Sequence, residues 1–306
     1  MQKNKKTTLF FLFFFSVFSL FFISCSHKAH SEKRIIAVST YAMYDIVKHL
    51  VGDTFEVVSI LPFGVDPHSF EPTPTLMAKI EDASLVVYSG AGLEPWTKNY
   101  TFKHHVIDMS KFVSLRKLGD HHHHEEHHLH NGVDPHYWLD IDNMIKATHV
   151  IANKLVEIAP NNKILYAENE KNYIASLKQL DNKFTVGLSS CKKDIIVVNH
   201  NAFGYLSRRY GFDVESLSGL VPEVEPSAKE MSHILDVVKE HHIKVIFFES
   251  FVSAKVIQTL ADELHVRVQT LQPLGNITAD EAKQKLTYEK IMQENLRKIS
   301  QALECQ

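Results

Sequence analysis

The chain has 306 residues and a nearly balanced charge, with 33 lysines and arginines against 36 aspartates and glutamates. This balance argues against a nucleic-acid partner bound through a general positive field. The length is sufficient for two lobes of ordinary domain size.

The first 25 residues have the pattern of a secretory signal. A basic start, Met1-Gln-Lys-Asn-Lys-Lys, precedes an apolar run from Leu9 to Ile23. This run is shorter than the about 20 residues that cross a bilayer as a helix. The segment Phe22-Ile23-Ser24-Cys25 resembles a bacterial lipobox, although Phe22 replaces the usual leucine. We therefore predict that residues 1–25 are a lipoprotein signal and that Cys25 is acylated, which anchors the protein to a membrane.

After a polar spacer, short β-branched runs alternate with helical patterns. Strands are expected at Ile35–Ser39, Phe55–Leu61 and Leu85–Ser89, with helices at 41–51 and 73–82 between them. The same rhythm restarts with strands at Ile195–Val198, Val214–Leu217, Val245–Phe248 and Val266–Thr270. This alternation predicts two α/β lobes, each with a parallel sheet covered by helices.

Two helical stretches lie between these groups of strands, at residues 140–158 and about 161–188. In the second stretch, apolar side chains recur every three or four positions along one face: Tyr173, Leu177, Leu180, Phe184 and Leu188. We predict an N-terminal lobe over 34–158, a rigid linker helix over 159–189 and a C-terminal lobe over 190–306. One stiff connector permits less hinge motion than several flexible crossovers.

Residues 121–130 contain seven histidines in ten positions: His121, His122, His123, His124, His127, His128 and His130. Only Leu129 is available for burial, so the segment cannot offset the roughly 1–2 kcal/mol of backbone entropy lost per ordered residue. Neutral imidazole binds zinc, copper or nickel, and we expect a loop that collects such ions. Its internal position and the interrupting Glu125 and Glu126 disfavour a purification tag. A solvated linker without a metal-binding role stays open as an alternative interpretation of this segment.

Three further histidines are expected in loops at the carboxyl ends of strands, where α/β folds place ligands. His68 follows Asp66-Pro67 in a proline-rich loop that holds the imidazole in a fixed place. His136 repeats the Asp-Pro-His-aromatic pattern, and His200 lies at the end of the first strand of the second lobe. Taken alone, each would be interpreted as a partly buried or surface histidine without a metal. Together they could close on one zinc ion in the interlobe cleft, since zinc accepts imidazole nitrogen at about 2.0–2.1 Å.

With these motifs, the chain resembles the substrate-binding proteins of bacterial ABC importers for zinc or manganese, from about Arg34 to the C-terminus. The resemblance continues through Asn199-His200-Asn-Ala-Phe-Gly-Tyr-Leu, Glu223-Val-Glu225-Pro226-Ser and Phe248-Glu249-Ser250. It implies two α/β lobes joined by a single rigid helix. It also implies that His68, His136 and His200 are the metal ligands, and that the acidic, His-rich loop scavenges or hands over metal, as in the zinc branch.

The fourth ligand position differs from the manganese branch of this family. Manganese members have an aspartate after the last strand of the second lobe, where this chain has Gln272, and tend to have a glutamate in place of His200. Hard Mn(II) prefers carboxylate oxygen, so three histidines favour Zn(II) over Mn(II) as the transported ligand. Water is expected at the fourth position, with Gln272 or a nearby carboxylate such as Glu71 as alternatives.

The resemblance implies a monomeric receptor in the periplasm or at the cell surface that delivers Zn(II) to an ABC importer permease with a cytoplasmic ATPase. A metal-binding surface lipoprotein or adhesin is the first alternative, and a three-histidine zinc hydrolase is the second. No His-Glu-x-x-His pattern is present, and Glu249 is expected to orient a ligand imidazole rather than to act as a base. We therefore expect no enzymatic activity.

Two cysteines remain if Cys25 is lipidated. Cys191 and Cys305 are an even pair, which in an oxidising compartment is compatible with a disulfide from the start of the second lobe to its last helix. The sequence alone does not place their Cα atoms within bonding range, so the pairing stays open.

Overall fold

The computed structural model describes residues 34–103, 105–118, 132–220, 227–250 and 261–306. The predictions for the signal segment 1–25, for Cys25, for the seven histidines of 121–130 and for Glu223 and Glu225 lie outside the described residues. Within the described ranges, no helix is both long enough and apolar enough to cross a membrane.

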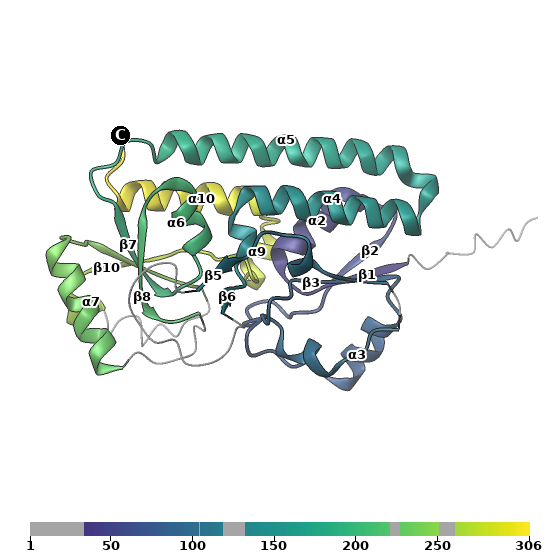
Figure 1. Ribbon diagram of the computed structural model, residues 1–306, viewed down its shortest axis with the longest axis horizontal. Helices are drawn as coiled ribbons and strands as arrows, with labels where there is room; N and C mark the ends of the chain where they lie inside the picture. Colours follow the sequence, from purple (N-terminus) through teal and green to yellow (C-terminus); the bar gives the residue numbers. More distant parts are fainter. Residues whose placement is uncertain (1–33, 104, 119–131, 221–226, 251–260) are drawn as a thin grey trace, which may run out of the picture. The chain divides into compact units, whose positions relative to one another are not determined.

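The first lobe contains a four-stranded sheet in the order β2-β1-β3-β4, with all neighbours parallel (Figure 1). Three strands match the predictions: β1 (Ile35–Val38), β2 (Glu56–Ser59) and β3 (Leu85–Tyr88). The predicted helices are α2 (Tyr41–Val51) and α3 (Pro74–Glu81). The edge strand β4 (Val106–Asp108) has only three residues and an exposed start, so it gave no strand signal.

The second lobe repeats this design with a parallel sheet in the order β10-β9-β7-β8. Its strands are β7 (Ile195–His200), β8 (Asp213–Ser218), β9 (Val245–Phe248) and β10 (Arg267–Thr270). Its helices are α6 (Gly204–Tyr210), α7 (Ala228–Glu240), α9 (Ala279–Lys283) and α10 (Tyr288–Ala302). Every residue of β7 is buried, which explains its uninterrupted apolar run. The prediction of two parallel α/β sheets is confirmed.

Two long helices connect the sheets, α4 (Ile141–Ile158) and α5 (Lys163–Gly187). The short turn between them begins at Pro160, which starts a new helical segment. The predicted stripe on α5 is buried, and α5 packs against α2, α4 and α10, so it contacts helices of both lobes (Figure 1). Residues 34–306 form one compact unit, and the lobe boundaries near 158 and 190 stay a prediction.

A disulfide joins Cys191 to Cys305 across a sequence separation of 114 residues. It links the segment that follows α5 to the chain end that follows α10. Backbone hydrogen bonds from Lys192 and Lys193 to Leu303 O, both 3.0–3.1 Å long, pair the same two segments. The first and last segments of the second lobe are therefore held side by side.

Candidate metal site

His68, His136 and His200 lie together between the two lobes. One nitrogen of each imidazole falls within 4.8 Å of the others, and the Nε2 atoms of His68 and His136 are 3.2 Å apart. The side chains of His136 and His200 are almost fully buried. Among the residues that the structure describes, this is the only group of three or more histidine, cysteine, aspartate or glutamate side chains close enough to hold one metal ion.

The His68 loop lies between β2 and α3 and is held from both lobes. The backbone N–H of His68 donates to Oδ1 of Asp66 at 2.9 Å, which is an Asx-turn hydrogen bond. The amide of Asn276, in the second lobe, donates to the carbonyl oxygens of Pro62 at 2.6 Å and of Val65 at 2.8 Å. A segment that follows β10 thus fixes the loop that presents His68.

His136 follows a small antiparallel hairpin of β5 (Arg116–Lys117) and β6 (Val133–Asp134). It therefore lies at the carboxyl end of a strand, as expected, although this strand belongs to the hairpin and not to the parallel sheet. Oδ1 of Asp134 accepts hydrogen bonds from the backbone N–H of His136 at 3.0 Å and from its Nδ1 at 2.9 Å. Arg116 donates to Oδ2 of Asp134 at 3.0 Å. Because Nδ1 carries the proton in this arrangement, Nε2 presents its lone pair to the cluster.

His200 is the last residue of β7, and Glu249 follows the neighbouring strand β9. Nδ1 of His200 pairs with the Glu249 carboxylate, while the Glu249 backbone N–H donates to Oδ1 of Asn199 at 3.1 Å. Burial alone would lower the pKa of His200, but the charge of Glu249 and its hydrogen bond outweigh burial and raise this pKa. Nε2 of His200 is buried and has no hydrogen-bond partner among the described residues. Such a nitrogen is costly unless a ligand occupies it.

The cavity at this cluster has a volume of about 10 Å³, the size of a single water or ion. Its lining comes from both lobes: Asp66, Pro67, His68, His136, Trp138, His200, Glu249, Pro273, Gly275 and Asn276. The Trp138 indole N–H closes one wall by donating to the carbonyl oxygen of Pro273 at 2.7 Å. Three imidazoles with two adjacent carboxylates form a donor set that fits a borderline cation.

Gln272, one of the two alternatives to water at the fourth position, does not line this cavity. Its side-chain amide is buried and donates to the two carboxylate oxygens of Glu281 at 3.2 and 3.1 Å. Glu281 is held there because it forms the capping box of α9 with Thr278. Glu71 is exposed and is also absent from the lining. The carboxylates that line the cavity are those of Asp66 and Glu249.

Asp66 is the site residue that sequence reasoning passed over. In both Asp-Pro-His segments, the aspartate accepts a hydrogen bond from the backbone N–H of the histidine two residues later, at 2.9 Å for Asp66 and 3.0 Å for Asp134. The repeat of the tripeptide was the available signal. Each Asp-Pro-His tripeptide forms the same turn, and the two turns bring His68 and His136 to the same cluster.

A family model described as "Zinc-uptake complex component A periplasmic", ZnuA, matches residues 36–302. The chain belongs to the ZnuA family. Members of this family are solute-binding proteins for zinc transport and not enzymes, which disfavours the hydrolase alternative.

Individual relatives agree with this ZnuA assignment. The chain is 33% identical to the high-affinity zinc uptake system protein ZnuA of Bacillus subtilis (strain 168), over 91% of this chain and 90% of the relative. It is 32% identical to the zinc-binding lipoprotein AdcA of Streptococcus pneumoniae (strain ATCC BAA-255 / R6), over 94% of this chain. The chain spans only 59% of that AdcA, which is a longer protein.

Solved structures of ZnuA-like proteins have the same fold. The Zn(II)-bound ZnuA-like domain of Streptococcus pneumoniae AdcA aligns with a TM-score of 0.75 and 30% identity, covering 89% of this chain and 99% of that domain. The laminin binding protein of Streptococcus agalactiae, described as bifunctional with adhesin and metal transporting activity, aligns with a TM-score of 0.78 and 30% identity, covering 88% and 99%.

Proposed function

We propose that this protein is an extracytoplasmic receptor that binds one Zn(II) ion through His68, His136 and His200. The observation that carries this proposal is the convergence of three imidazoles from both lobes, with a buried nitrogen of His200 that has no partner among the described residues. The names of the relatives, zinc-binding and zinc-uptake proteins, support zinc over Mn(II). Water completes the coordination, with Asp66 and Glu249 beside it.

The receptor delivers its zinc to the permease of an ABC importer that has a cytoplasmic ATPase. Membership in a family of zinc-uptake components supports this partner. The protein acts as a monomer in the periplasm or at the cell surface, anchored through a lipid on Cys25. The lipoprotein designation of AdcA supports the anchor. Adhesion is the second candidate function, favoured by the likeness to the laminin binding protein of Streptococcus agalactiae.

The His-rich run 121–130 supplies metal to this site. Of the described residues that flank this run, Leu118 donates its backbone N–H to the carbonyl oxygen of Gly132 at 2.8 Å, next to the hairpin of β5 and β6. Two residues later the chain reaches Asp134, which contacts His136. Several weak sites tethered this close raise the local metal concentration at the cluster.

A titration with zinc and with manganese, by calorimetry against a competing chelator, tests the proposal. We expect one tight zinc equivalent, weak manganese binding, and loss of the tight equivalent in His68→Ala and in His200→Ala. The exposed His105 provides the control His105→Ala, which should bind as the unaltered protein does.

Deletion of residues 121–130 should lower the total stoichiometry and leave the tight equivalent. If the deletion removes the tight equivalent, the His-rich run is the primary receptor and our order of the two sites is reversed. If no tight zinc equivalent exists in the full chain, the proposed function is wrong.

A further inference from the structure

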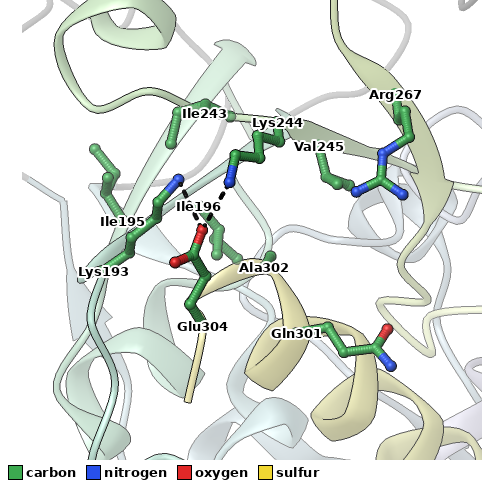
Figure 2. Close-up of a pocket in the computed structure, with 10 residues that line it drawn as sticks. All are labelled: Lys193, Ile195, Ile196, Ile243, Lys244, Val245, Arg267, Gln301, Ala302 and Glu304. Carbon is green, nitrogen blue, oxygen red and sulfur yellow. Dashed lines mark hydrogen bonds and ion pairs between the residues drawn. The ribbon is translucent and has the colours of Figure 1, made fainter.

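A second cavity, of about 250 Å³, lies at the amino-terminal edge of the second lobe's sheet (Figure 2). Its lining residues lie at the starts of β7, β9 and β10 and at the end of α10: Lys193, Ile195, Ile196, Ile243, Lys244, Val245, Arg267, Gln301, Ala302 and Glu304. His200 and Glu249 lie at the other, carboxyl-terminal ends of β7 and β9. The two cavities share no residue.

Three cations and one carboxylate surround this cavity. Lys244 pairs with Glu304 at 3.1 Å and Lys193 pairs with it at 3.6 Å, as Figure 2 shows. A hydrogen bond from Lys244 and the charges of both lysines lower the pKa of Glu304, so this carboxylate is ionised at neutral pH. With Arg267 included, three positive charges face one negative charge, which leaves a formal charge of +2.

The remaining polar groups on the wall are donors. The guanidinium of Arg267 is exposed and makes no hydrogen bond or ion pair with any described residue. Oε1 of Gln301 accepts from Arg297 at 3.0 Å, so the Gln301 NH2 group is left as a donor. The apolar residues of the lining, Ile195, Ile196, Ile243 and Val245, are buried, so the accessible wall is mainly polar. Donors with excess positive charge suit a small anion.

We propose that this cavity binds the carboxylate or phosphate group of a small anion. The anionic group contacts Arg267, whose planar fork matches either oxygen pair, and the lysines add charge. The site does not depend on the proposed zinc binding.

The probes are hexanoate, hexyl phosphate and the neutral hexanol, each titrated into the full protein and followed by amide NMR shifts at Ile196 and Val245. We expect at least one of the two anions to bind in the millimolar range or tighter. The stronger of the two identifies the head group. Hexanol should shift neither amide.

Two variants of opposite charge make the test specific. Arg267→Gln should weaken anion binding about tenfold, because it removes a charge-assisted contact. Glu304→Gln should tighten binding by about threefold or more, because it removes the competing carboxylate. The control Arg208→Gln, at an exposed arginine of α6 in the same lobe, should leave the affinity unchanged.

A variant that merely damaged the fold would not tighten binding, so the opposite signs separate a binding site from a structural role. The proposal is overturned if neither anion binds, if hexanol binds as well as the anions, or if the affinity is the same in Arg267→Gln and Glu304→Gln. Tight zinc binding should be unchanged in both variants.

Discussion

Replacing Asp134 with asparagine should weaken zinc binding about 10- to 100-fold. The Asp134 carboxylate is completely buried, accepts two hydrogen bonds from His136, and is paired with Arg116 at 3.0 Å. In Asp134→Asn, an NH2 group replaces one of the two accepting oxygens, so a donor must face either His136 or Arg116, which are donors themselves. The ligand imidazole then loses a charged acceptor that orients it, a change that costs about 1.4–2.8 kcal/mol of metal affinity in comparable sites.

The assay is a zinc titration against a competing chelator. Chemical denaturation, run in parallel, separates lost affinity from lost stability, since Arg116 is left unpaired in a part-buried place. Asp236→Asn, at an exposed aspartate of α7, is the matched control and should bind zinc normally. A folded Asp134→Asn protein whose zinc affinity lies within twofold of the unaltered protein would refute the reasoning.

Three further expectations follow from the site and the fold. Gln272→Ala should leave zinc affinity within about twofold and lower the free energy of unfolding by about 1–2 kcal/mol, since its amide binds Glu281; a large fall in zinc affinity would restore it to the fourth position. Zinc affinity should fall with pH, and the decline should begin above pH 6.5, because the raised pKa of His200 lets protons compete with zinc there. A dissociation constant that stays the same from pH 8 to pH 5.5 would contradict this. Replacing Cys191 and Cys305 by serine should lower the free energy of unfolding by about 2–5 kcal/mol, measured by urea denaturation; an unchanged midpoint would mean that the disulfide contributes nothing.

The sequence predicted the buried parts of the fold well because burial produces strong patterns. β7 is buried at every residue and α5 buries a regular stripe, and both were located within a few residues. The elements that were missed bury little. β4 has three residues, and the hairpin of β5 and β6 pairs only two residues of each strand. A short edge element takes its conformation from its neighbours, which a local pattern does not record.

The candidate site shows the same division. The three histidines stand in recognisable motifs, and the structure brings them together. The position of Gln272 depends on Glu281, nine residues away, which draws its amide from the cavity. The contribution of Asp66 depends on a turn that the tripeptide encodes but that only the folded loop displays. The proposed ligands could be predicted from residue type and motif. The positions of Gln272 and Asp66 could not, because they depend on hydrogen bonds that form only in the folded protein.

The disulfide has a consequence for the proposed extracytoplasmic receptor if a protease cuts its second lobe. A single backbone cut anywhere between Cys191 and Cys305 leaves both fragments covalently joined, because the bond spans almost the whole second lobe. After a cut between β8 and β9, for example, the fragment with β9, β10 and α10 cannot diffuse away from the fragment with His200. Under reducing conditions only noncovalent contacts, such as the pairing of β7 with β9, would hold the two fragments together.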